Sequence, residues 1–186
     1  YWQAVKKGVE NKAAELGVTV NFVGPDSESN IDQQVQQLQS ALNASPTAVG
    51  LAALDTNSVM DLLQQAKDSG IPVVGFDSGV PNAPEGSVLA NCSTDNYAAG
   101  ALAAEKVYEA VKDRISGNVR IGVVAQDATS ESVVNRGLGF IDKFAELAVA
   151  DGHTATVVGN DRYISDSKCE KTEGANVVID VRVPAQ

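Results

Sequence analysis

The stretch AKDSGIPVVGFDSGV, residues 66–80, contains the transition that decides the fold. A helical segment ends at Gly70, an apolar run follows over 72–76, and the run stops at Asp77, where Ser-Gly begins a turn. A glycine directly after a helical pattern is a common helix stop, and a short continuous apolar run is typical of a strand buried on both faces. The stretch therefore predicts a helix followed by a strand with a carboxylate at its carboxyl end.

The same helix-strand unit recurs along the chain in both directions. Apolar residues at helical spacing predict helices over 1–16, 27–43, 58–69, 97–113 and 131–148. Short apolar runs predict strands over 18–23, 48–54, 72–77, 87–94, 118–126, 153–159 and 175–183. Regular alternation of the two indicates an α/β fold with parallel sheets covered by helices. Because the two halves repeat this pattern, we place an N-terminal lobe at 1–94 and a partial C-terminal lobe at 95–186.

The composition excludes several classes of protein. The formal net charge is −10, whereas a nucleic-acid surface needs clustered Lys and Arg. Two cysteines, Cys92 and Cys169, and a single histidine do not make a disulfide scaffold, a zinc site or a His-based triad. Nucleotide-binding, phosphate-loop and nucleophile-elbow motifs are absent. We therefore predict no enzyme activity, no catalytic residues, no metal ligands and no cofactor, and leave open whether the cysteines pair in an oxidising compartment.

Four aspartates follow predicted strands, at the sheet edge where ligands bind in open parallel sheets. Asp55 and Asp95 directly precede helices, so capping of the helix is the favoured role for both. Asp127 has Thr129 and Ser130 as rival caps. Asp77 is followed by Ser-Gly-Val-Pro instead of a helix, and its carboxylate is therefore favoured as a group that accepts hydrogen bonds from a polar ligand.

Three further features allow both a structural and a functional interpretation. Arg136 is either a solvated surface charge or a guanidinium that enters a cleft, and Gly137 and Gly139 beside it indicate close packing, we expect against the sheet. Tyr1 and Trp2 are either the start of a core stripe or a platform for the apolar face of a sugar. The segment NDRYISDSKCE, residues 160–170, does not match a calcium loop and is predicted to be a solvated insertion.

Taken together, the segments resemble the type I periplasmic sugar-binding proteins, a superfamily that contains ribose-binding protein and the effector domains of lactose-repressor-like regulators. Six motifs occur in the family's order along nearly the whole chain. They are YWQAVKKGVENKAAELG (1–17), NIDQQVQQLQSAL (30–42), AVGLAALDTNSV (48–59), AKDSGIPVVGFDSGV (66–80), STDNYAAGALAAE (93–105) and NRGLGF (135–140). The resemblance implies two Rossmann-like lobes that close over a sugar and no chemical reaction.

Residue by residue, the resemblance implies a ligand site. Tyr1 and Trp2 would stack on the sugar ring, Asp77 would bind hydroxyl groups from the first lobe, and Arg136 would bind them from the second. Ser78 stands where the ribose-binding relative has an arginine, so the identity of the sugar stays open. At the first hinge crossing the resemblance places Asp95 and Asn96, with Asp95 in a capping role.

The resemblance also implies partners and a compartment. The full-length protein would pass a small-molecule sugar to a membrane ABC permease from a periplasmic or extracellular position, with a lipid anchor as one form of attachment. Compared with the family, the chain lacks an opening strand and later elements of the second lobe, so we expect a fragment truncated at both ends that can self-associate through a free sheet edge. The alternative is the effector-binding domain of a lactose-repressor-family regulator; an α/β enzyme is disfavoured.

Overall fold

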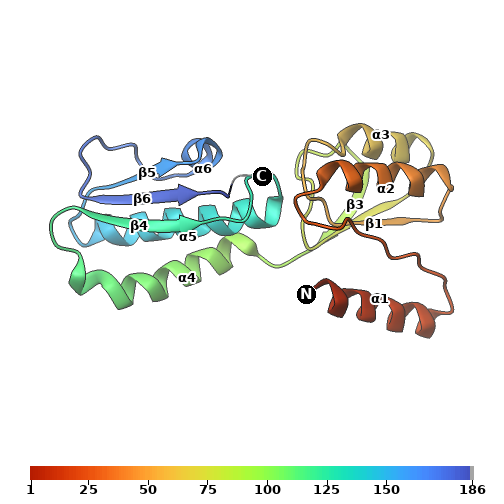
Figure 1. Ribbon diagram of the computed structural model, residues 1–186, viewed down its shortest axis with the longest axis horizontal. Coiled ribbons are helices and arrows are strands. Elements are labelled where there is room, and N and C mark those ends of the chain that lie inside the picture. The colour runs from red at the N-terminus through yellow and green to blue at the C-terminus, as the bar shows by residue number, and fades with distance from the viewer. Residues whose placement is uncertain (185–186) are drawn as a thin grey trace.

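The computed structural model describes residues 1–184 and contains two three-stranded parallel sheets, one in each of two lobes (Figure 1). The first sheet has the strand order β1-β2-β3 and the second the order β4-β6-β5. Residues 93–95 connect β3 of the first sheet to α4 of the second lobe. The prediction of an α/β fold with parallel sheets is confirmed. No helix within residues 1–184 has the length and apolar character needed to cross a membrane.

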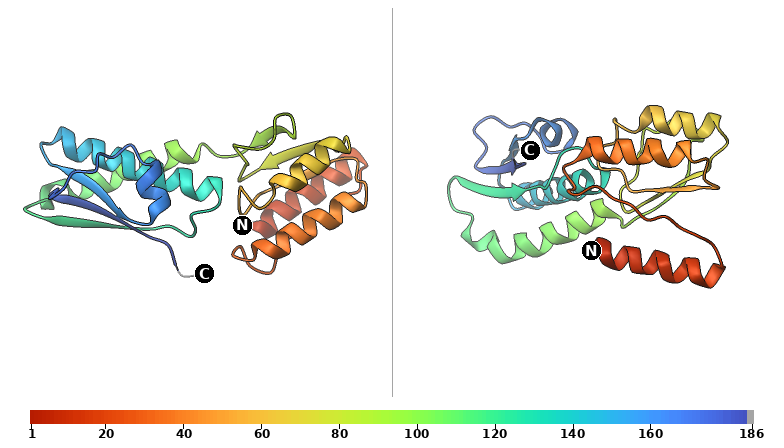
Figure 2. Two further views of the ribbon diagram at one scale, coloured as in Figure 1. Left: turned by 90° about the horizontal axis from the view of Figure 1, so that it is seen from above. Right: turned by 45° about the vertical axis from the view of Figure 1, so that its right-hand side comes forward.

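The first lobe contains three helices around its sheet. Helices α2 and α3 cover one face, and α1 lies toward the other (Figures 1 and 2). The core of this lobe is formed mainly by leucines and valines of α2, α3 and the strands, with Leu63 and Val73 fully buried. The elements are α1 (Trp2–Leu16), α2 (Ile31–Asn43), β1 (Val49–Leu51), α3 (Met60–Asp68), β2 (Val73–Phe76) and β3 (Val88–Cys92).

The second lobe has the larger core. Helices α4 and α5 pack against each other on one side of the sheet, and Ile141, Phe144 and Ile179 are fully buried between helix and strands. The elements are α4 (Asn96–Val111), a 3-10 helix (Lys112–Arg114), β4 (Val119–Val124), α5 (Glu131–Ala150), β5 (Ala155–Gly159), α6 (Asp161–Asp166) and β6 (Val177–Arg182). The predicted helices and strands of this lobe therefore form, with shorter strands than predicted.

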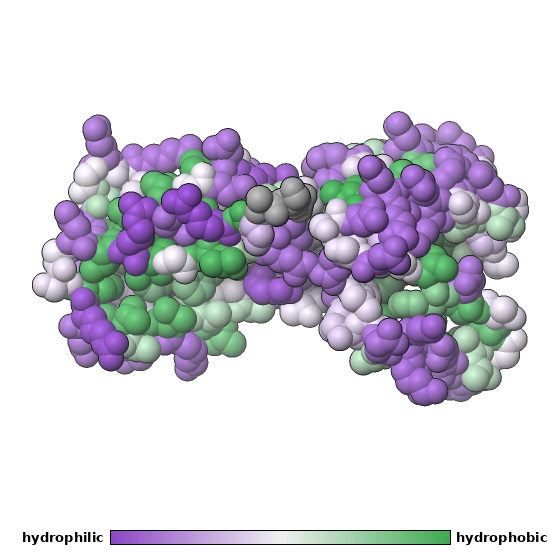
Figure 3. Space-filling view, viewed as in Figure 1, coloured by the Kyte–Doolittle hydropathy of each residue, from purple (hydrophilic) through white to green (hydrophobic). Residues whose placement is uncertain are grey.

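The strand predicted over 18–23 does not form. These residues are paired with none of the described strands, and β1 stands at an edge of the first sheet with β2 as its one bonded neighbour among residues 1–184. Val18, Val20 and Val23 are each about half exposed, at 54%, 50% and 54%. Helix α1, which precedes the segment, buries none of its residues, and apolar side chains are visible at the hollow between α1 and the rest of the lobe (Figure 3). An alternating pattern is insufficient for a strand without a neighbour that accepts its backbone hydrogen bonds.

Two other sequence predictions need correction. Residues 160–170 are not simply a solvated insertion, because they contain α6, whose Tyr163 is fully buried and donates to the carbonyl oxygen of Asp127 at 2.9 Å. The glycines of α5 do pack closely, but against helices instead of the sheet. A methyl group at position 139 would lie 2.0 Å from the carbonyl oxygen of Tyr97 in α4, and one at position 137 would lie 2.5 Å from the ring of Tyr163 in α6.

Tyr108 makes the stability of the second lobe sensitive to alkaline pH. Burial, and then the hydrogen bond to Asp151 at 2.8 Å, raise the pKa of Tyr108 from 10.0 to about 12. The folded chain thus holds this proton more tightly than the unfolded chain. The resulting stabilisation is complete below pH 10.0 and is lost as the pH rises to about 12. We expect the free energy of unfolding, measured with urea at a series of pH values, to fall across this window.

Tyr108→Phe should flatten this decline, because the phenylalanine has no proton to lose. Burial also raises the pKa of Tyr163 and of Tyr97, so part of the decline should remain in the variant. Equal slopes for the variant and the natural chain between these pH values would contradict the prediction.

Candidate ligand-binding site

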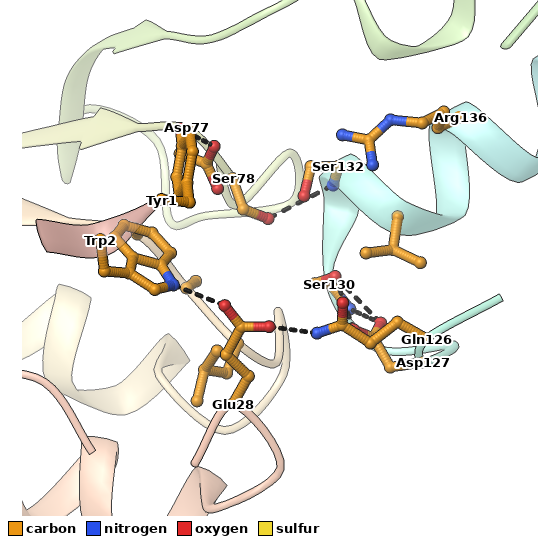
Figure 4. Close-up of a pocket in the computed structure, with 14 residues that line it drawn as sticks. Tyr1, Trp2, Glu28, Asp77, Ser78, Gln126, Asp127, Ser130, Ser132 and Arg136 are labelled. Carbon is orange, nitrogen blue, oxygen red and sulfur yellow. Dashed lines mark hydrogen bonds between the residues drawn. The ribbon is translucent and has the colours of Figure 1, made fainter. Parts of the chain in front are cut away.

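A cavity of about 280 Å³ lies between the two lobes (Figure 4). Its walls come from segments that follow the strands, at 52–54 after β1, 77–78 after β2 and 126–127 after β4, together with the first turns of α5. This is the edge at which parallel α/β sheets bind ligands. The remaining wall is formed by the start of α1 and by Glu28.

The cavity is lined mainly by polar side chains from both lobes. The first lobe contributes two aromatic residues, three polar or acidic ones and the apolar segment 52–54, and the second contributes Val133 and five polar or charged residues. The lining side chains drawn and labelled in Figure 4 are Tyr1, Trp2, Glu28, Asp77, Ser78, Gln126, Asp127, Ser130, Ser132 and Arg136. The five residues predicted from the sequence to contact a ligand, Tyr1, Trp2, Asp77, Ser78 and Arg136, therefore line one cavity.

Asp77 lies in a tight turn directly after β2. Its φ of 59° is in the left-handed region, which aspartate tolerates better than most residues. The backbone N–H of Asp77 donates to the carbonyl oxygen of Cys92 at 3.0 Å, which ties the turn to β3. Its carboxylate accepts the hydroxyl of Tyr1 at 2.5 Å. This hydrogen bond, then partial burial and the negative charge of Asp77, raise the pKa of Tyr1 above its ordinary value of 10.0.

Arg136 approaches the cavity from the second lobe, in the second turn of α5. One of its guanidinium N–H groups donates to the side-chain oxygen of Asn96 at 2.6 Å. Asn96 is itself buried and donates to the carbonyl of Thr94 at 3.0 Å, so the connection between the lobes orients the arginine. A guanidinium has five N–H donors, and the bond to Asn96 uses one of them. Asp95 caps α4 by accepting the N–H of Ala98 at 2.9 Å and does not line the cavity.

The other two strand-end aspartates organise turns. Asp55 is buried and accepts hydrogen bonds from the N–H of Asn57 at 2.9 Å and from Ser58. Asp127 is buried too, and accepts the N–H groups of Thr129 and Ser130 at 3.0 and 2.9 Å. These bonds fix the turn that leads into α5. Asp127 also lines the cavity, but its carboxylate bonds to residues of its own turn.

The aromatic pair forms one corner of the cavity. The rings of Tyr1 and Trp2 meet edge to face with centroids 5.0 Å apart, and Trp2 meets Phe76 in the same way at 6.3 Å. The indole N–H of Trp2 donates to Glu28 at 2.5 Å. Tyr1 remains largely exposed, so the corner offers apolar ring surface beside polar groups.

Hydrogen bonds also join the lobes directly around the cavity. The hydroxyl of Thr129 donates to the carbonyl of Leu54 at 3.0 Å, and the N–H of Gly79 donates to Glu131 at 2.7 Å. The N–H of Ser132 donates to the hydroxyl oxygen of the buried Ser78 at 3.3 Å. The structure therefore has its lobes in contact on either side of the cavity.

Sequence reasoning missed Glu28, Gln126, Ser130 and Ser132 as residues that line the cavity. Gln126 is the last residue of the strand predicted over 118–126, as Asp77 is of the strand predicted over 72–77, so the rule that pointed to Asp77 would have found it. Glu28 lies in a polar stretch before α2 and carries no local signal. The two cysteines are both free, Cys92 in the first lobe and Cys169 in the second. Within residues 1–184, no cluster of three or more His, Cys, Asp or Glu side chains is arranged to hold a metal ion.

Comparison with known proteins gives consistent matches. A family model described as a periplasmic binding protein domain matches residues 1–177. The D-allose-binding periplasmic protein of Escherichia coli (strain K12) is 28% identical over 113 residues, which cover 59% of this chain and 36% of that protein. The chain thus spans about a third of the length of this curated relative.

Two solved structures extend the match over more of the chain. An ABC transporter, LacI family transcriptional regulator from Brachyspira murdochii is 34% identical with a TM-score of 0.73, and the match covers 100% of this chain and 53% of the other. An ABC transporter solute binding protein from Agrobacterium vitis with bound D-fucose is 26% identical with a TM-score of 0.67, covering 87% of this chain and 64% of the other.

Proposed function

The chain belongs to the periplasmic binding protein domain family, and from this premise we propose that it captures a monosaccharide between its two lobes for an ABC importer. This is a family of substrate-binding proteins and not of enzymes. The observation that carries the proposal is the shared cavity, in which a carboxylate from the first lobe and a guanidinium from the second line the same space beside two aromatic rings.

These groups suit the chemistry of a neutral sugar. Sugar hydroxyl groups both donate and accept, so Asp77 would accept from one set of hydroxyls and Arg136 would donate to another through charge-assisted bonds. The Tyr1–Trp2 corner would pack against the C–H face of the ring. At about 280 Å³ the cavity lies just below the range of about 300–1,000 Å³ typical of sites for drug-sized ligands, which favours one sugar ring over an oligosaccharide.

Binding in such a site depends on closure. Asp77 and Arg136 stand on different lobes, so a sugar contacts both only when the lobes approach each other. A ligand shifts the balance between open and closed forms only by the extra contacts that it makes in the closed form. The proposed role of the sugar is therefore to hold the lobes together. The closed protein, outside the cytoplasm, would then be the form that the membrane permease recognises.

The names of the relatives support this proposal and keep one alternative open. The E. coli relative is named for D-allose, and the Agrobacterium vitis structure contains D-fucose. The Brachyspira murdochii protein is described both as an ABC transporter and as a LacI family transcriptional regulator. The second candidate is therefore an effector-sensing domain of such a regulator. In the encoding gene, a secretion signal upstream of Tyr1 would support the importer role, and a basic helix-turn-helix would support the regulator.

The test of sugar binding is a thermal-shift screen of the protein against neutral monosaccharides, including D-allose and D-fucose, with free amino acids as a control panel. A specific sugar at about one hundred times its dissociation constant should stabilise the fold by about 2.7 kcal/mol and raise the melting temperature by about 5–10 °C. The amino acids should leave the melting temperature unchanged. A screen in which no monosaccharide raises it would overturn the proposed function.

A further inference from the structure

Glu28 joins the two lobes at the rim of the cavity. Its carboxylate accepts the indole N–H of Trp2 at 2.5 Å, and its second oxygen accepts the side-chain amide of Gln126 (Figure 4). Trp2 belongs to α1 in the first lobe, whereas Gln126 follows β4 in the second. Because an ionised carboxylate has two acceptor oxygens, it can bond both donors at once. One side chain thus connects an aromatic ring of the cavity to the opposite lobe.

The backbone on the Glu28 side of this bridge is held in place by α2. The N–H of Asp26 donates to the side chain of Gln33 at 2.8 Å, and the side-chain amide of Gln37 donates to the carbonyl of Gly24 at 3.0 Å. These bonds flank Glu28 on its N-terminal side and tie its loop to two partly buried glutamines of α2. The carboxylate therefore projects from a supported loop, although the side chain itself is exposed.

The backbone on the Gln126 side is supported as well. The next residue, Asp127, is buried and holds the turn into α5 through Thr129 and Ser130, while its carbonyl accepts the hydroxyl of the buried Tyr163 at 2.9 Å. Gln126 is thus held rigidly in the second lobe. When the lobes separate, it moves with that lobe and its bond to Glu28 breaks, because no flexible loop takes up the movement.

We propose that Glu28 is a positioning residue that couples closure of the two lobes to the orientation of the Trp2 indole. In the closed form both oxygens are engaged and the indole is held at the cavity wall. When the lobes separate, Gln126 leaves, the carboxylate turns toward water, and the indole loses its anchor. The contribution of this coupling to ligand binding rests on the proposed function, in which Trp2 packs against the sugar ring.

The coupling can be tested without any ligand, because Trp2 is the only tryptophan among 186 residues. Its fluorescence therefore reports on this corner alone. Acrylamide quenching measures how exposed the indole is, and small-angle scattering gives the radius of gyration, which increases when the lobes separate. Gln126→Glu places two carboxylates opposite each other and should increase both quantities. Gln126→Ala removes the amide without adding charge and should change both in the same direction by less.

The decisive variant exchanges the two side chains. In the double variant Glu28→Gln with Gln126→Glu, the amide at 28 accepts from the Trp2 indole and donates to the new carboxylate, so quenching and radius of gyration should return to the values of the natural chain. Gln36→Glu adds the same charge on an exposed face of α2 and should change neither quantity. Circular dichroism confirms that each variant is folded.

The coupling is overturned if Gln126→Glu and Gln126→Ala leave quenching unchanged, or if the exchanged pair behaves like Gln126→Glu alone. These results do not depend on sugar. A failed sugar screen with normal rescue would therefore refute the proposed function alone, and sugar binding with no rescue would refute the coupling alone.

Discussion

Replacing Asp77 with alanine is expected to weaken sugar binding by about 2–3 kcal/mol, which raises the dissociation constant by about 30- to 150-fold. The carboxylate lines the cavity after β2 and is the acidic group that the proposed site opposes to Arg136. Its removal would leave sugar hydroxyls without a charged acceptor and would also free the hydroxyl of Tyr1, which now donates to Asp77 at 2.5 Å. Isothermal titration calorimetry with the sugar identified by the thermal-shift screen measures the change directly.

The backbone at position 77 requires a second variant. Its φ of 59° suits aspartate and asparagine better than alanine, so Asp77→Ala also strains the turn. Asp77→Asn keeps the turn and one acceptor oxygen but removes the charge. Because charge-assisted bonds are about twice as strong as neutral ones, this variant should lose roughly half as much binding free energy as Asp77→Ala. Asp95→Ala is the matched control: it removes the cap of α4, costs about 1 kcal/mol of stability and leaves affinity unchanged. Unchanged affinity in both Asp77 variants would refute the assignment.

The candidate site could be predicted from the sequence where its residues follow a local rule. Asp77 stands out because an apolar strand ends at a carboxylate and no helix begins there, so capping does not explain it. Asp55 and Asp95 also follow predicted strands, and capping is the role that the sequence favours for both. Asp95 does cap α4, whereas Asp55 bonds the turn before α3, whose N-cap is Val59. Because strand ends meet at one edge of a sheet, the same reasoning places several such residues together.

The parts that could not be predicted depend on partners distant in the sequence. Glu28 and Gln126 are 98 residues apart, and nothing in the polar loop around Glu28 marks it as a bridge. The segment 18–23 has the alternation of a strand but lacks a paired neighbour, a condition that periodicity does not measure. Helix α6 has only six residues, too few for a helical stripe, and is anchored mainly by the buried Tyr163.

The crossing of α4 and α5 should tolerate no side chain at Gly139. A methyl group there would lie 2.0 Å from the carbonyl oxygen of Tyr97, and one at Gly100 would lie 2.0 Å from that of Arg136, so each helix presses on the backbone of the other. Alanine would force the helices apart, because no side-chain rotation relieves a clash with backbone. We expect Gly139→Ala to lower the free energy of unfolding by about 3 kcal/mol, at the upper end of overpacking costs, and the melting temperature by about 6–12 °C.

The same crossing sets the position of the site. Arg136 lies on α5 and its partner Asn96 on α4, at 2.6 Å, so separated helices would also misplace the guanidinium and weaken sugar binding. Gly8→Ala is the matched control, since Gly8 is a helical glycine in α1 with open space where a methyl group would go, and alanine there should stabilise the helix by up to about 1 kcal/mol. If Gly139→Ala melts at or above the temperature of the natural chain, the two helices do not cross with their backbones in contact, and the placement of Arg136 at the cavity loses its structural basis.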